Sequence, residues 1–270
     1  MKNSDPLRPA PLICLLIAMG AYGCVAVPLE DGADAVSSGR RYRQVQLLDP
    51  GAKDLASLHF HIHAYDFETT RAVSEQCERL YSQIMTDSGL DTFRPQEPYR
   101  VVIYGTHEEF LRKTGLPHWS AGAADGTSLY SFAGEHLQWT LPHEVTHLIF
   151  AEYMGLYTHT HKWLNEGLAV YEEQQAVPLR ASSQRDSAPI AFSAMVTMTP
   201  LSEQDRDVNA WYHQVGSVAR FMIERSRGPG FHLFLRALRD GKNLDEAISI
   251  GYPAQWRSFS DLEQAWRRAH

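Results

Sequence analysis

His143-Glu144-Val145-Thr146-His147 has the pattern H-E-x-x-H, inside a segment whose apolar residues recur at helical spacing. Residues four apart on a helix lie on one face, one turn above the other. His143 and His147 can therefore present two imidazole nitrogens to one metal ion. Glu144, beside His143, can reach a water molecule bound to that ion. The pattern thus predicts a helix that carries two metal ligands and an adjacent carboxylate.

A third ligand is needed if zinc is to be held with one coordination position left open. Glu166 is the candidate, because it follows His147 after eighteen intervening residues, in a second stretch with helical spacing. The first helix is expected to begin at Thr140, which can cap it, and to stop at Gly155. The alternative is a buried pair of histidines on a core helix, with both glutamates as solvated charges. That alternative leaves the spacing of the whole group unexplained.

The motif H-E-V-T-H, followed after eighteen residues by the glutamate of W-L-N-E-G-L-A, resembles the gluzincin zinc peptidases. Within that group it is most similar to the small peptidase-MA-like proteins. The resemblance covers about residue 55 to the C-terminus, and its motif residues lie between residues 141 and 171. It implies that His143, His147 and Glu166 bind one Zn²⁺ per chain.

The resemblance also implies two catalytic roles. Glu144 would be the general base, which takes a proton from a zinc-activated water and later delivers it to the leaving amine. Tyr212, near the start of a later helix, would stabilise the developing oxyanion, since that charge appears only in the transition state. His213 is an alternative donor, and simple packing of the Tyr212 ring on the core is a third interpretation.

Two sequence features of the larger gluzincin peptidases are missing from this chain, and their absence narrows the expected activity and site. No G-x-M-E-N run, which recognises a free amine in the exopeptidases, precedes His143. An endopeptidase is therefore favoured over an aminopeptidase. Thermolysin-like enzymes place an aspartate four residues after the third ligand, and Val170 stands there in this chain. The sequence therefore does not identify the partners of the ligand histidines, although metal-bound histidines normally need such a partner.

The order of expected elements predicts an α+β, zincin-like fold. A mixed α/β N-terminal subdomain over residues 45–155 carries the H-E-x-x-H helix. A helical C-terminal subdomain over residues 156–270 carries the third ligand, with the active-site cleft between the two. Strands are expected at 45–48, 57–65, 100–104 and 126–132, and helices at 69–87, 108–114, 140–154, 209–226, 229–239, 243–250 and 259–269. The resemblance implies that the strand at 126–132 is an edge strand that pairs with extended substrate.

Three histidines alternate along the expected strand at 57–65. His59, His61 and His63 invite a metal hypothesis, but strand positions two apart are separated by about 6.6–6.8 Å. They are therefore interpreted as one polar face of the strand. Cys77 lies in a helical pattern of apolar residues and is expected to be a small core residue.

The first 24 residues are interpreted as a signal peptide, because a basic head precedes an apolar run too short for a comfortable membrane span. The run ends in Ala21-Tyr22-Gly23-Cys24, which resembles a bacterial lipobox. Lipidation of Cys24 would anchor the protein in the bacterial cell envelope, at the outer membrane or the periplasmic face, with residues 25–44 as a flexible linker. Ordinary secretion, with Cys24 incidental, is the alternative.

The net charge of −7 gives no reason to expect a nucleic-acid partner. The sequence therefore predicts a membrane-tethered zinc metallopeptidase that acts on peptide or protein substrates. One alternative is a non-catalytic zinc-binding lipoprotein that acts as a binding or scaffolding module. Another is a zinc hydrolase that acts on a non-protein amide.

Overall fold

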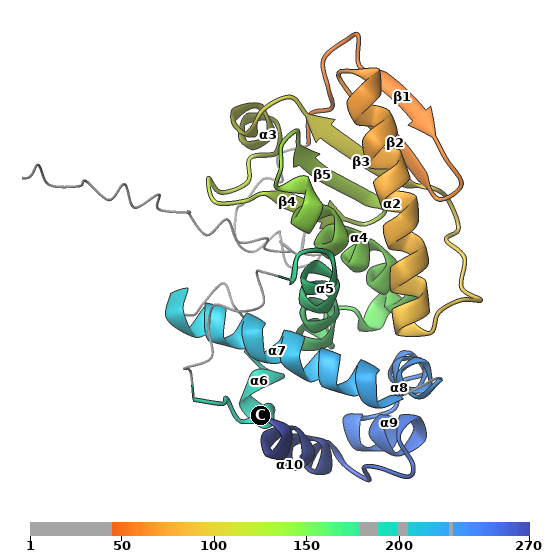
Figure 1. Cartoon of the computed structure of the whole chain (residues 1–270), viewed down its shortest axis with the longest axis vertical. Coiled ribbons are helices and arrows are strands. Elements are labelled where there is room, and N and C mark those ends of the chain that lie inside the picture. The colour runs from red at the N-terminus through yellow and green to blue at the C-terminus, as the bar shows by residue number, and fades with distance from the viewer. Residues whose placement is uncertain (1–44, 179–187, 199–204, 227–228) are drawn as a thin grey trace, which may run out of the picture.

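A computed structural model describes residues 45–178, 188–198, 205–226 and 229–270. The expected signal peptide, linker and Cys24 lie outside these ranges. The fold is a mixed α+β architecture, with a five-stranded sheet toward one end and packed helices toward the other (Figure 1). Among the described residues, no helix has both the length and the apolar character that crossing a membrane requires.

The sheet has the strand order β1-β2-β3-β5-β4. β2, β3 and β5 run parallel, and the two outer strands β1 and β4 run antiparallel to their neighbours. The strands span β1 Lys53–Ala56, β2 Phe60–Ala64, β3 Tyr99–Tyr104, β4 Gly122–Asp125 and β5 Ser128–Phe132.

Helices cover both faces of this sheet. α2 (Phe67–Ser88) packs on β1 and β2, and α4 (Leu137–Met154) packs on β4 and β5. Alternate side chains of β3 point to opposite faces of the sheet and therefore enter two different cores. Val101 and Ile103 join the main core under α2 and α4, whereas Val102 and Tyr104 join a smaller cluster. α3 (His107–Thr114) closes that smaller cluster on the opposite face.

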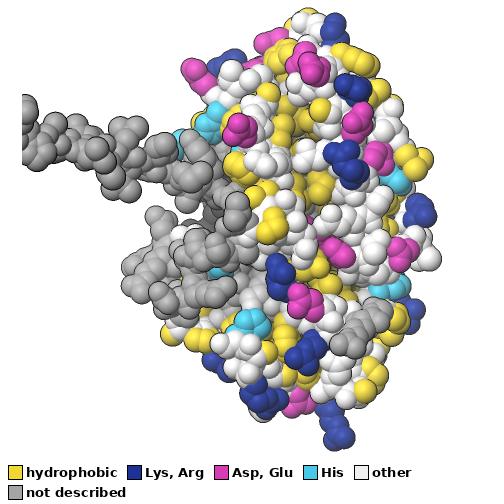
Figure 2. Space-filling model, in the orientation of Figure 1, with side chains coloured by type: hydrophobic (Ala, Val, Ile, Leu, Met, Phe, Trp, Pro, Cys, Tyr) yellow, Lys and Arg dark blue, Asp and Glu magenta, His cyan; other side chains and the backbone are white. Residues whose placement is uncertain are grey.

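The remaining elements are helical. They are the 3₁₀ turn η1 Gly155–Tyr157 and the helices α5 Lys162–Ala176, α6 Phe192–Met195, α7 Asp205–Ser226, α8 Gly230–Arg239, α9 Leu244–Gly251 and α10 Phe259–Ala269. α5 lies between α4 and α7, and one continuous core runs from β2 through α4 and α5 to α10. On the face shown in Figure 2, basic and acidic side chains are interspersed rather than gathered by sign.

Most expected elements are present, but four expectations need correction. The segment at 45–48 is not a strand, and the sequence patterns missed β1 and β4. The segment at 126–132 contains β5, which is an interior strand, so the edge strand at this end is β4. α4 begins at Leu137 with His136 as its N-cap, so Thr140 lies inside the helix rather than capping it. Cys77 is a free, fully buried cysteine, as predicted.

Two glycines allow α5 and α7 to approach closely. A Cβ atom at Gly167 would lie only 2.6 Å from the backbone oxygen of Val215, and a Cβ at Gly216 would overlap the Val170 side chain. Both contacts are closer than real Cβ atoms come to other atoms. Because Gly167 directly follows Glu166, this helix contact fixes the position of the predicted third ligand.

We therefore expect Gly167→Ala to lower the free energy of unfolding by about 1–3 kcal/mol, the usual cost of overpacking a core. In an exposed helix the same change raises stability by about 1 kcal/mol, so the sign is diagnostic. Gly216→Ala should also destabilise, but Val170→Ala should rescue it, because the obstacle there is a side chain that can be shortened. Denaturant unfolding of the variants tests this, and a stabilising Gly167→Ala would contradict it.

Candidate metal centre

Two adjacent helices bring the three predicted ligands together. His143 and His147 lie one turn apart on α4, and Glu166 lies in the first half of α5. Glu166 Oε2 is 3.7 Å from His143 Nε2 and 3.6 Å from His147 Nε2. All three side chains are buried, with at most 4% of their surface exposed. The predicted ligand set is therefore a compact internal group that could hold a metal ion.

The spacing of these atoms fits a metal ion. Bonds of 2.0–2.1 Å to a tetrahedral zinc ion put neighbouring ligand atoms about 3.3 Å apart. The two separations from Glu166 Oε2 exceed that value by only a few tenths of an ångström. His143 Nε2, His147 Nε2 and Glu166 Oε2 are buried and have no hydrogen-bond partner. Buried polar atoms are almost always paired, so three unpaired atoms that face one another call for a shared cation.

Two residues that the sequence patterns did not assign hold the ligand histidines. His147 Nδ1 donates a hydrogen bond to Asn165 Oδ1 at 2.8 Å, which leaves Nε2 with its lone pair toward Glu166. His143 Nδ1 lies 3.3 Å from Glu173 Oε2, within ion-pair distance. Such partners orient the rings and raise the basicity of the ligand nitrogens. Val170 stands at the position where thermolysin-like enzymes have the aspartate that orients a ligand histidine. In this chain Glu173, about one helical turn further along α5, places a carboxylate beside His143 instead.

Both partners had a signal in the sequence. Asn165 directly precedes the predicted third ligand, and Glu173 follows Glu166 by seven residues. Seven residues make two helical turns, so Glu166 and Glu173 share a face of α5. A search for carboxylates on the ligand-bearing face of α5 would therefore have found Glu173.

The charge balance of the group favours a cation. Burial lowers the pKa of His147 to about 4, so its ring is neutral at pH 7 and able to bind a metal. Burial also opposes protonation of His143, but the Glu166 and Glu173 carboxylates outweigh it and raise the pKa of His143 to about 10. The pKa of Glu166 is lowered: the two histidines outweigh its burial. The centre therefore attracts positive charge.

Glu144, the predicted base, is fully buried, and neither carboxylate oxygen has a hydrogen-bond partner. Burial raises its pKa to about 8. The edge strand β4 approaches it closely: a Cβ at Gly122 would lie 3.2 Å from Glu144 Oε1. A residue without a side chain at position 122 thus leaves room beside this carboxylate.

Tyr212 lies on α7, one turn before Val215, whose carbonyl faces Gly167. Its ring makes an edge contact with Trp211, with ring centroids 5.1 Å apart, and its hydroxyl oxygen is buried. The tyrosine is therefore on the helix that packs against the third ligand. His213, the alternative donor, is half-buried, and burial lowers its pKa.

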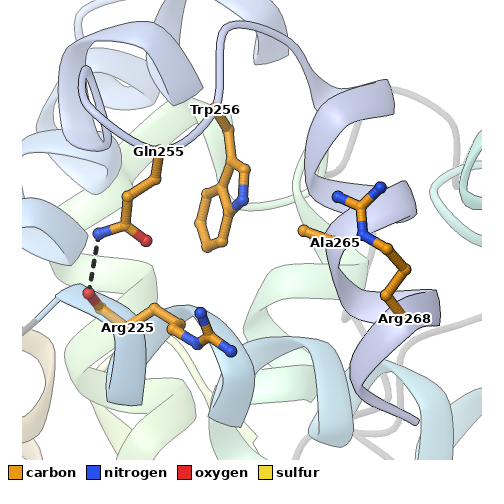
Figure 3. Close-up of a pocket in the computed structure, with 5 residues that line it drawn as sticks. All are labelled: Arg225, Gln255, Trp256, Ala265 and Arg268. Carbon is orange, nitrogen blue, oxygen red and sulfur yellow. Dashed lines mark hydrogen bonds between the residues drawn. The ribbon is translucent and has the colours of Figure 1, made fainter.

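A separate pocket lies in the C-terminal helices (Figure 3). Arg225, Gln255, Trp256, Ala265 and Arg268 line it. The Gln255 amide donates a hydrogen bond to the backbone oxygen of Arg225 at 3.0 Å, and the Trp256 ring forms one wall. This pocket contains none of the predicted site residues.

Comparison with known proteins adds no assignment: no family, no curated protein and no solved structure matches this chain.

We expect Asn165→Ala to weaken metal affinity by about 10–100-fold, the usual effect of removing a partner of a ligand histidine. Asn165→Asp is the matched control, because it keeps an oxygen that accepts from His147 Nδ1. Competition titration of Zn²⁺ against a chromophoric chelator measures both variants. Equal affinity for Asn165→Ala and the wild type would show that this contact does not support the centre.

Proposed function

We propose that this chain is a zinc-dependent metallopeptidase, of the gluzincin type that the motif resembles. The observation that carries the proposal is the group of three unpaired, buried ligand atoms of His143, His147 and Glu166. Two imidazoles and one carboxylate form the donor set that catalytic zinc sites use when one position is left for substrate. The adjacent Glu144 carboxylate adds the group that distinguishes a catalytic centre from a structural one.

Zinc, when bound by these three residues, would polarise a scissile carbonyl and make water a better nucleophile. Glu144 would take the proton from the attacking water and pass it to the leaving amine. A carboxyl group performs both steps best when its pKa lies near the working pH. Burial raises the pKa of Glu144 to about 8, which is in that range.

Tyr212 would donate its phenolic hydrogen to the oxygen that becomes negative in the transition state. This role rests on its place on α7, the helix packed against α5, and on the resemblance. A donor of this kind lowers the barrier because the charge it meets is absent from the ground state.

The open edge of β4 supports a peptide substrate and internal cleavage. β4 ends the sheet, and within the described residues it pairs only with β5. An extended peptide could add to this edge through main-chain hydrogen bonds. Because Gly122 on β4 lies against Glu144, a chain bound there would pass the proposed base. This strand replaces the segment at 126–132 as the substrate edge.

The metal and the reaction are tested with one variant. The full-length chain should bind Zn²⁺ at the three ligands and cleave a peptide library. Glu144→Gln should keep that Zn²⁺ and reduce turnover at least about 100-fold, because it removes the base and spares the ligands. Elemental analysis and mass spectrometry of the library give the two readouts.

A protein that binds zinc at this centre but leaves every peptide uncut would favour the non-catalytic binding or scaffolding lipoprotein. Cleavage of non-peptide amides alone would favour the other hydrolase. A wild type without zinc affinity, or full activity in Glu144→Gln, would refute the proposal.

We further propose that lipidation of Cys24 tethers the catalytic body to a bacterial envelope membrane. Cys24→Ser should then shift the protein from the membrane fraction to the soluble fraction, because a serine cannot carry the thioether-linked lipid. Fractionation followed by immunoblotting measures the shift. Membrane association that is unchanged by the substitution would contradict the anchor.

A further inference from the structure

A second group of metal-binding side chains lies on the strands at the far edge of the sheet. His61 and His63 lie on β2, on the side opposite Phe60 and Ile62, which enter the main core. Asp54 on β1 is the register partner of His63. The imidazole of His63 hydrogen-bonds through Nδ1 to the Asp54 carboxylate, and this contact links the two strands.

The histidine rings converge despite their separation along the strand. Backbone positions two apart are about 6.6–6.8 Å from each other. The rings of His61 and His63 nevertheless incline toward one another, with centroids 4.4 Å apart. Asp54, His61 and His63 each offer one ligand atom, and these atoms all lie within 4.8 Å of one another. The expected polar strand face thus contains a potential chelating group.

The third histidine of the alternating run does not belong to this group. The His59 ring stacks on Tyr81, with centroids 3.8 Å apart. Its Nδ1 is 2.7 Å from one carboxylate oxygen of Glu78, and the other oxygen accepts from the His59 backbone N–H. His59 is therefore engaged with α2, and it provides a matched control of the same residue type.

The contact between His63 and Asp54 gives a metal a place to bind. His63 Nδ1 and an Asp54 carboxylate oxygen face one another, and a Zn²⁺ ion would bind between them in place of the proton that they share. Asp54 is 60% exposed, so water can complete the coordination sphere.

The charges around the group predict weaker binding than at the buried centre. Asp54 contributes one negative charge, but Arg100 on β3 is the register partner of His61 and brings a positive charge to the same region. The ligand atoms must also close from up to 4.8 Å toward the spacing of about 3.3 Å that tetrahedral zinc requires. Partly exposed side chains can make that adjustment, at some loss of affinity.

We propose that Asp54, His61 and His63 form a second Zn²⁺ site, which ties the edge strand β1 to β2. β1 has only four residues and a mostly exposed surface, so few packing contacts hold it. A metal ion bound by side chains of both strands would cross-link this edge. The inference is independent of the proposed peptidase activity, because it involves none of the residues at the buried centre.

Calorimetric titration of the metal-free, full-length chain with ZnCl₂ separates the two sites. The wild type should show a tighter and a weaker site. Glu166→Ala should lose the tighter one and keep the weaker one. The double variant His61→Gln, His63→Gln should weaken the second site at least about 10-fold and keep the first. A glutamine amide at position 63 can still donate to Asp54, so this variant spares the contact between the strands.

The control His59→Gln should retain both sites. In Glu166→Ala, Zn²⁺ should also slow amide hydrogen exchange in β1, and this effect should vanish when both histidines are replaced. A Glu166→Ala variant that binds no Zn²⁺, or a double variant that keeps two sites, would overturn the proposal. A wild type that shows the weaker site but lacks the tighter one would refute the proposed function and leave this second site standing.

Discussion

The burial of Glu166 between two imidazoles is the interaction on which the rest of the site depends. A carboxylate moved out of water is costly unless paired charge and hydrogen bonds replace the lost solvation. Here its partners are two histidines. Asn165 accepts a hydrogen bond from the outer nitrogen of His147, and Glu173 lies within ion-pair distance of the outer nitrogen of His143. The inner atoms remain unpaired. Buried, unpaired atoms of this kind attract positive charge. A bound metal ion therefore accounts for these unpaired atoms better than the alternative of a core helix with two ordinary buried histidines.

Four elements of the fold build and support this charged group. α4 supplies the two imidazoles, α5 supplies the carboxylates, and β4 borders the Glu144 side chain. α7 supports α5 from behind, where Gly167 permits backbone contact. The close contact at Gly167 therefore also serves the site, because Glu166 can stay at its distance from the two histidines only if the helices do not shift.

Much of this could be predicted from the sequence, because helical spacing is a strong signal. The ligands four residues apart and most helix boundaries follow from local periodicity. The short strands β1 and β4 could not be predicted, since four residues carry little pattern and β4 contains Gly122 and alanines. The helix start at Leu137 lacks a capping side chain, so Thr140 was a misleading signal. Convergence of His61 and His63 depends on side-chain orientation, which strand spacing alone does not determine.

All the side chains of the buried centre come from one contiguous helical hairpin, between residues 143 and 173. The entropy lost in closing a loop grows with the number of residues enclosed, so bringing these ligands together costs little. The parallel strands, by contrast, join segments far apart in the chain and are slow to form. If the proposed metal ion binds here, it can capture the hairpin early in folding, and the order of assembly would then depend on metal supply in the compartment where the chain folds.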